Sequence, residues 1–450
     1  MTGAATSVAV LLGGTAPAYA GTGHAPASRL GADVAHTWVR AAYRAVLLEN
    51  LTPPTAARAY AHTALAMYEA AVAGMPGHVT LAGQLAGLVP AVDGRGVAGV
   101  VTAPGRARLD WPLAVSAAAK GLLLGLLPHR SPLTRSHLDA VHADVVASRR
   151  AAGVGPRETA DSLAHGAAVA ARLLAWTATD GHAEASARPY TPPSGLPWHW
   201  ESTPPNYRPA IEPYCEDVRP LVLRSTDEVA AGPHVPFSAE PGSEFWHQAV
   251  AVLEQSRRNG DEERAIARFW TDNPGSFTPP LGTPTGLPSG HWMLLVEQTS
   301  RLLDLRLDEA LEAYVRLGVT LHDAFLACWT VKYRTNLLRP VTYIQRHVDP
   351  TWLSFVNTPQ FPEHTSGHSV SSAAAAVVLT DLLGSFAFVD DTHAERGYPA
   401  RSFSDFTDAA DEAAGSRLFG GIHYPRGIEA GLAQGEEIGA LVLRRLRTRR

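Results

Sequence analysis

The segment Leu321–Ile344, LHDAFLACWTVKYRTNLLRPVTYI, holds one of the two lysines of the chain in an apolar run with helical spacing. Lys332 and Arg339 are seven residues apart, so a continuous helix would place them on one face, about 10 Å apart along its axis. Pro340 then disturbs or ends that helix. Because two cations on one face of a buried helix repel each other, the pattern favours a site where they share an anion.

A second segment, FPEHTSGHS at Phe361–Ser369, has the features of an anion-binding helix start. Thr365 or Ser366 is a natural N-cap, and a helical run, SVSSAAAAVVL, follows. A helix N-terminus presents free backbone N–H groups and the positive end of the helix dipole. Gly367 lets the backbone approach a ligand closely, and His368 adds a group that titrates near neutral pH.

A third segment is GSRLFGGIHYPRG, Gly415–Gly427. Arg417 and His423 are six residues apart, and the Gly420-Gly421 pair between them permits a tight turn. Arginine can hold an oxyanion through two parallel hydrogen bonds, and a neutral imidazole can act as a nucleophile or metal ligand. Each segment alone also fits an ordinary capped helix or surface loop.

Together and in this order, the three segments resemble the signature of the vanadium-dependent haloperoxidases and the type 2 phosphatidic acid phosphatase superfamily. The wider stretch from Leu321 to Ile344 is similar to bacterial haloperoxidases, as are TPPNYRPA and ERAIARFW earlier in the chain. The resemblance extends from about Tyr190 to the C-terminus. The Ser-Gly-His at Ser289–His291 precedes Lys332 and lies outside the signature, so we interpret it as a helix start with a structural role.

The resemblance implies a site for vanadate, or for phosphate in its place. The side chains expected to hold the equatorial oxygens are cationic, with a serine hydroxyl and a backbone N–H beside them: Lys332, Arg339, Arg417, Ser366 and Gly367. His423 would bond to vanadium or attack phosphorus, and His368 would act as the acid–base group. Phe361 is a candidate halide-site residue, because family members active on chloride tend to carry phenylalanine there.

The implied function is a vanadate-dependent haloperoxidase that oxidises halide with hydrogen peroxide, giving hypohalous acid equivalents that halogenate organic acceptors. Two alternatives remain open: a soluble acid phosphatase that works through a phosphohistidine, and a non-catalytic phosphate-binding homologue. The non-catalytic homologue is disfavoured, because His368 and His423 are both present. The resemblance also makes a homodimer an ordinary expectation.

Two residues depart from the family pattern. Gly427 stands four residues after His423, where family members often carry an acid, and Thr365 stands where proline is common. A carboxylate at position 427 would orient the imidazole of His423 through a hydrogen bond. Without it, a backbone carbonyl or another acid must fix the tautomer of His423. The candidate acids are Glu363, Glu429 and Asp323.

The fold class expected is all-α, with helical bundles, a long Pro/aromatic-rich excursion and no convincing strands. We divide the chain into a possible signal peptide at 1–20, an N-terminal helical region at 21–181, the excursion at 182–243 and a catalytic bundle at 244–450. Apolar periodicity and caps predict the helices Leu30–Asn50, Pro54–Ala73, Pro112–Leu127, Ser131–Ala152, Pro156–Thr179, Glu244–Arg258, Glu262–Thr271, Gly290–Leu305, Asp308–Leu338, Ser366–Leu383 and Gly427 to the C-terminus.

Composition excludes several classes of protein. The 450 residues are 46% hydrophobic and 18% charged, as in a folded globular protein, and the net charge of −5 argues against a nucleic-acid partner. Cys215 and Cys328 are expected to be unpaired thiols. No apolar run reaches the ~18 residues that span a bilayer. The apolar start ending in Ala18-Tyr19-Ala20 resembles a secretion signal, which favours a secreted or extracytoplasmic protein over a cytoplasmic one.

Overall fold

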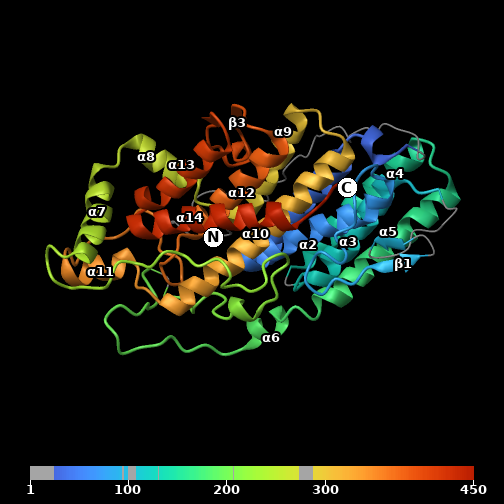
Figure 1. Ribbon diagram of the computed structural model, residues 1–450. Helices are drawn as coiled ribbons and strands as arrows, with labels where there is room; N and C mark the ends of the chain where they lie inside the picture. Colours follow the sequence, from blue (N-terminus) through green and yellow to red (C-terminus); the bar gives the residue numbers. More distant parts are fainter. Residues whose placement is uncertain (1–24, 94–95, 100–107, 130, 206, 273–286) are drawn as a thin grey trace, which may run out of the picture.

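The computed structural model describes residues 25–93, 96–99, 108–129, 131–205, 207–272 and 287–450, and confirms the expected all-α class (Figure 1). The leader at 1–20 lies outside these residues, and the four-part division of the chain stays a prediction. The α-helices of the described part are α1 Asp33–Glu49, α2 Pro53–Ala71, α3 Trp111–Leu126, α4 Pro132–Ala151, α5 Pro156–Thr177, α6 His182–Ala187, α7 Glu244–Arg258, α8 Asp261–Phe269, α9 Leu287–Leu302, α10 Leu307–Thr335, α11 Pro340–His347, α12 Gly367–Leu383, α13 Phe406–Phe419 and α14 Pro425–Arg445.

The long helix α10 runs through the middle of an elongated molecule and joins two groups of helices (Figure 1). On one side it packs against α2, which in turn contacts α3, while α3 packs on α5. On the other side it packs against α12, which contacts both α13 and α14. Helix α2 is buried on all faces, because its many alanines let neighbouring helices surround it. Helix α10 therefore connects the two groups.

The expected helix Asp308–Leu338 ends early, which corrects the relation between Lys332 and Arg339. Helix α10 ends at Thr335, because Asn336 adopts the left-handed conformation at φ 47° and ψ 41°. Arg339 lies outside that helix, as the N-cap of α11, with an extended backbone. The residue before a proline is held away from helical angles, and Pro340 then starts the next helix. The two cations therefore do not share a helix face.

Strands were not expected, and here the prediction was wrong in detail. Two short antiparallel pairs occur in the described residues: β1 Ala91–Asp93 with β2 Gly96–Gly99, and β3 Phe388–Asp390 with β4 Arg401–Phe403. The first pair lies in a Gly/Val-rich stretch, Gly83–Pro104, for which the sequence predicts a loop. Strands of three or four residues carry too few alternating positions to give a period-2 signal.

The Pro/aromatic-rich excursion lies along the C-terminal half of α10. Its backbone pairs with the α10–α11 connection, where Trp200 N donates to Asn336 O at 2.8 Å and Leu338 N to Trp198 O at 2.8 Å. The side chains of Trp329 and Tyr333 on α10 both donate to Ile211 O, at 3.1 and 2.7 Å. Hydrogen bonds of this kind replace regular secondary structure in holding the segment.

Helices α12 and α14 approach each other unusually closely, because glycines line the facing side of α14. A Cβ atom built on Gly435 would lie 2.2 Å from Val370 O, and one on Gly431 would lie 2.9 Å from Ser366 O. At the near end of this contact, Ser366 N donates to Gly427 O at 2.9 Å. The contact thus fixes the N-terminus of α12 beside the start of α14.

The expectation of unpaired cysteines is confirmed. Cys215 and Cys328 are buried free thiols. Among the helices that the structure describes, none is long and apolar enough to cross a membrane.

We expect Gly435→Ala to lower the free energy of unfolding by about 1–3 kcal/mol or more, because the added methyl group would collide with the α12 backbone. Denaturant unfolding followed by circular dichroism measures this change. Gly415→Ala on α13 is the matched control, since a Cβ there meets its nearest atom, Phe419 Cε2, at 4.0 Å. The control should be neutral or stabilising by up to about 1 kcal/mol. Equal losses in both variants would contradict the proposed close contact.

Candidate functional site

The structure brings the three segments together at one buried place in the C-terminal half. Lys332 lies near the end of α10, Arg339 caps α11 and Arg417 lies near the end of α13. His423 lies in the turn between α13 and α14. All four are at most 3% exposed. Burial lowers the pKa of His423 well below its usual value, and the nearby positive charges lower it further.

Glu363 and Arg339 fix the orientation of the His423 ring. Nδ1 of His423 lies 2.7 Å from Glu363 Oε1, which also accepts the backbone N–H of Tyr424 at 3.1 Å. On the other side, Nε2 of His423 lies 3.1 Å from Arg339 Nη1, which can only donate. The proton of a neutral ring therefore sits on Nδ1, and Nε2 carries the lone pair.

Of the three acids considered for this role, Glu363 contacts the imidazole. The Asp323 carboxylate instead accepts three backbone N–H groups, at 2.7 to 2.9 Å, from residues 221–223. Glu429 is 68% exposed and pairs with Arg426. A Cβ built on Gly427 would lie 2.3 Å from Glu363 Oε1, so the missing side chain at 427 leaves the space that this carboxylate occupies. Glu363 therefore takes the role expected of an acid at position 427.

Arg339 is held by backbone carbonyls and keeps one donor in reserve. Its Nε donates to Phe361 O and its Nη1 to Ile422 O, both at 2.8 Å. Its Nη2 is buried and has no hydrogen-bond partner in the part of the chain that the structure describes. A buried donor without a partner is unfavourable by about 1–3 kcal/mol, and an oxyanion would satisfy it.

Lys332 is also completely buried, but its ammonium group contacts backbone. Nζ donates to Pro362 O at 3.1 Å, to Glu363 O at 2.9 Å and to Thr365 O. Burial lowers the pKa of Lys332 to about 7. These bonds hold the loop that carries Glu363 and leads to Ser366.

Phe361 lies beside the two cations that flank this loop. Its ring centroid is 5.1 Å from Lys332 Nζ and 4.9 Å from Arg339 Cζ, and it packs on Trp329 at 4.7 Å. The ring is 8% exposed. Phe361 thus packs in the core and at the same time places an apolar ring beside the two cations.

Helix α12 begins at one of the two N-cap residues that the sequence predicts. Ser366 is the N-cap, and its Oγ accepts the N–H of Ser369 at 3.3 Å. Gly367 is the first helical residue, so its N–H has no partner within the helix.

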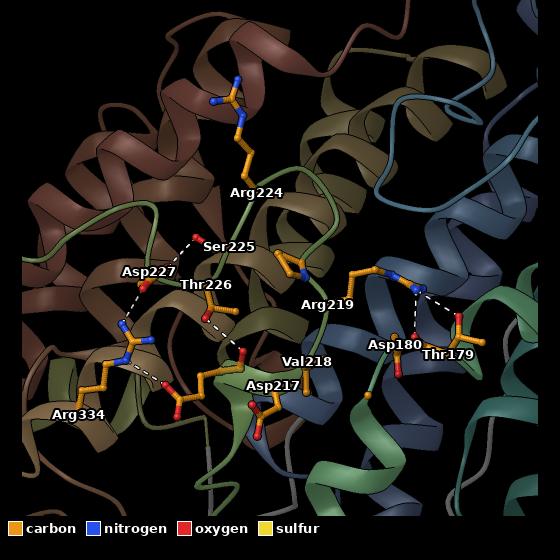
Figure 2. Close-up of a pocket in the computed structure, with 13 residues that line it drawn as sticks. Thr179, Asp180, Asp217, Val218, Arg219, Arg224, Ser225, Thr226, Asp227 and Arg334 are labelled. Atoms are coloured by element: carbon orange, nitrogen blue, oxygen red, sulfur yellow. Dashed lines mark hydrogen bonds and ion pairs between the residues drawn. The ribbon is translucent and has the colours of Figure 1, made fainter.

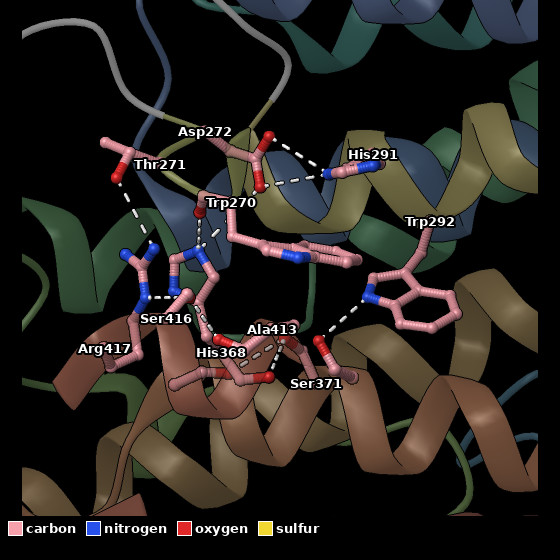
Figure 3. Close-up of polar contacts among 12 residues, drawn as sticks. Trp270, Thr271, Asp272, His291, Trp292, His368, Ser371, Ala413, Ser416 and Arg417 are labelled. Atoms are coloured by element: carbon pink, nitrogen blue, oxygen red, sulfur yellow. Dashed lines mark hydrogen bonds and ion pairs between the residues drawn. The ribbon is translucent and has the colours of Figure 1, made fainter. Parts of the chain in front are cut away.

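His368 and Arg417 lie together on the side of the site that faces α8 (Figure 3). His368 Nε2 lies 2.8 Å from Trp270 O and 3.8 Å from Asp272 Oδ2. Burial, with the charge of Arg417, lowers the pKa of His368 to about 3, although its side chain is 19% exposed. Arg417 Nε donates to Ser416 Oγ at 2.8 Å, and its remaining contacts, to Ala267 and Thr271, are 3.5 Å long.

Trp270 and Asp272 are neighbours of the site that the sequence did not indicate. They follow α8, whose ERAIARFW segment was noted only for its resemblance to haloperoxidases. No spacing links them to His368, about a hundred residues later, so a single sequence offered no signal for this contact.

The chemistry of these donors fits a tetrahedral oxyanion. Three buried cations, a serine hydroxyl, a helix N-terminus and the unpartnered Arg339 Nη2 are present, while His423 offers an unprotonated Nε2. Such a set can hold vanadate or phosphate, with His423 as the group that bonds to the central atom.

A separate surface pocket of about 470 Å³ is lined by residues 179–181 after α5, by residues of the excursion and by Arg334 on α10 (Figure 2). Arg334 pairs with two carboxylates of the pocket, Glu216 at 2.9 Å and Asp227 at 2.8 Å. Arg219 donates to the backbone and hydroxyl oxygens of Thr179. Arg334 and Arg219 of this pocket therefore have hydrogen-bond partners, whereas Arg339 Nη2 of the buried site has none among the described residues.

Comparisons with known proteins agree with the fold. A family model described as the VCPO second helical-bundle domain matches residues 312–449. Among solved structures, the chain is similar to the first bacterial vanadium-dependent iodoperoxidase. The identity is 33% and the TM-score 0.84, with 93% of this chain and 97% of that chain covered. No curated protein matches the chain.

The chain also shares its fold with a bacterial vanadium-dependent chloroperoxidase. With the holo form, the identity is 16% and the TM-score 0.63, and 92% of this chain and 97% of that chain are covered. With the apo form, the values are 15% and 0.60, and 87% and 94% are covered.

We expect Arg417→Met to leave the free energy of unfolding unchanged or to raise it, because burial disfavours this charge and lowers the pKa of Arg417 to about 10. Arg149→Met is the matched control: this buried arginine pairs with Asp110 through contacts of 2.5 to 3.1 Å. Breaking that pair should be destabilising by about 3–5 kcal/mol. Denaturant titrations in anion-free buffer compare the two, and a similar loss in both would show that the charge of Arg417 is fully compensated.

Proposed function

The chain belongs to the vanadium-dependent haloperoxidase family, and we propose that it oxidises halide with hydrogen peroxide, using vanadate held by the residues of the buried site. The observation that carries the proposal is the fixed tautomer of His423, whose unprotonated Nε2 lies among three buried cations. An imidazole held in this way suits bonding to an electron-poor central atom, while the cations compensate the charge of its oxygens.

Each protein group has a defined task in the proposed site. Arg339 Nη2 and Arg417 would donate hydrogen bonds to the oxygens of the anion, and the Ser366 hydroxyl and the Gly367 N–H would add two more. Lys332 contributes charge and holds the loop that carries Glu363, through its contacts with the carbonyls of residues 362, 363 and 365. Glu363 keeps the proton of His423 on Nδ1.

His368 is the proposed acid–base group. Its ring is partly exposed, whereas the other five side chains of the site are buried, so it can exchange protons with solvent. The contact of Nε2 with Trp270 O fixes the ring orientation. Burial and Arg417 lower its pKa to about 3, so the ring is neutral near pH 7 with Nε2–H donating to Trp270 O. Nδ1 is then the nitrogen that would accept a proton, once the negative charge of a bound oxyanion raises this pKa.

Vanadate, when bound, supplies the Lewis acidity that activates hydrogen peroxide toward a halide. Phe361 and Trp329 form an apolar wall beside the cations and exclude water from that side. Iodide is the first halide to propose, because the solved structure with 33% identity is an iodoperoxidase. Activity on chloride, suggested by Phe361, stays a prediction.

The test adds orthovanadate to vanadate-free protein and measures peroxide-dependent halogenation of an organic acceptor with iodide, bromide and chloride. We expect iodination that requires vanadate and that disappears in His423→Ala. His247→Gln, an exposed histidine on α7, is the control and should behave like the wild type. Hydrolysis of a phosphate ester that vanadate inhibits, without halogenation, would instead identify a phosphatase. Phosphate binding with neither activity would identify a non-catalytic homologue.

Glu363→Gln should reduce vanadate affinity by about 10–100-fold, because the amide keeps the shape of the side chain but loses the charge that holds His423 Nδ1–H. Titrating halogenation rate against vanadate measures the apparent affinity. Glu429→Gln, at an exposed position, removes the same charge at a distance and should change nothing. Unaltered affinity in Glu363→Gln would rule out the proposed positioning role.

A further inference from the structure

A second buried cluster of ligand-type side chains lies beside the proposed vanadate site. Asp272 follows α8, His291 lies on α9 and His393 follows β3. One carboxylate oxygen and two ring nitrogens of these residues lie within 4.8 Å of one another. All three side chains are at most 2% exposed. Figure 3 shows the Asp272 carboxylate facing His291 on one side, with His368 below it.

The two separations between the Asp272 carboxylate and the histidine nitrogens match those between neighbouring ligands of a single small cation. Asp272 Oδ1 lies 3.3 Å from His291 Nδ1 and 3.0 Å from His393 Nε2. In a tetrahedral zinc site with bonds of about 2.0–2.1 Å, neighbouring ligand atoms are about 3.3 Å apart. A cation can therefore enter between these atoms with small side-chain movements.

The orientation of His291 is already fixed by its surroundings. Its Nε2 lies 2.8 Å from Asp390 Oδ2, and the other Asp390 oxygen accepts the N–H and hydroxyl of Thr392 at 2.9 and 2.7 Å. Trp270 stacks on the imidazole with ring centroids 4.6 Å apart and planes 24° apart. Metal-binding histidines characteristically donate their second nitrogen to a carboxylate in this way. This contact turns Nδ1 of His291 toward Asp272.

His393 supplies an independent sign of a missing ligand. The side chain is 1% exposed, and neither ring nitrogen has a hydrogen-bond partner among the residues that the structure describes. Nε2 is close to Asp272 Oδ1 but lies outside hydrogen-bond geometry. A buried imidazole without a hydrogen bond is unfavourable by about 1–3 kcal/mol. A bond from Nε2 to a cation would satisfy it.

We propose that Asp272, His291 and His393 bind one divalent cation of the zinc class, with water as the fourth ligand. Two imidazoles and one carboxylate suit zinc, whereas magnesium and calcium prefer oxygen ligands throughout. The site is separate from the one proposed for vanadate and does not depend on it. The two are nevertheless coupled, because the second oxygen of Asp272 lies 3.8 Å from His368 Nε2. A cation held by Asp272 therefore alters the electrostatic environment of His368.

The test uses the full-length chain without a histidine tag, stripped with a chelator and kept free of vanadate and phosphate. After equilibration with Zn²⁺ and desalting, elemental analysis should find about one zinc per chain. Co²⁺ in place of Zn²⁺ should give the strong visible absorption of a four-coordinate site. Neither readout needs peroxidase activity, so this proposal and the proposed function fail independently.

Variants then assign the ligands. His393→Gln should lose the bound zinc, and Asp390→Asn should weaken binding by about 10–100-fold, because it frees the second nitrogen of His291. His247→Gln, exposed on α7, is the control and should keep the metal. Wild-type protein without stoichiometric zinc would overturn the proposal, as would a folded His393→Gln that retains it. If His393→Gln does not fold, the wild-type and Asp390→Asn titrations decide.

Discussion

The close contact between α12 and α14 is the constraint on which the buried site depends. Because Gly431 and Gly435 have no side chains, the two helix backbones approach until Ser366 N bonds to Gly427 O. This contact sets the N-terminus of α12 against the turn that carries His423. A larger residue at any of these glycines would separate the helix start from the imidazole, and the donors would no longer converge.

The same contact explains how the chain keeps a carboxylate on His423 without an acid at position 427. Glu363 reaches the imidazole from the loop before α12 and fills the space above Gly427. Lys332 holds that loop through backbone carbonyls, so a buried cation and a buried anion stabilise the same short segment. The carboxylate thus comes from the loop before α12, and the tautomer of His423 stays defined.

A buried polar network extends from this site toward α9. Asp272 connects His368 to the cluster around His291, whose ring is held by Trp270 and Asp390. The Ser-Gly-His at Ser289–His291 lies in the first turn of α9, as expected, and the Asp272 carboxylate connects its histidine to the proposed acid–base group. Burying so many ionisable groups together is unfavourable unless they are paired or bind a ligand, which is why such clusters mark functional regions.

The sequence by itself determined the all-α class, most helix positions and the three segments that meet at the site. These features are local: apolar spacing, the Ser366 cap and the proline start of α11 act within a few residues. Only the tertiary structure decided that Arg339 leaves the helix of Lys332, that Glu363 serves His423 from 60 residues away, and that Asp272 lies next to His368. Such contacts depend on how helices pack around small residues, and local patterns in one sequence carry no record of which distant side chain fills the space.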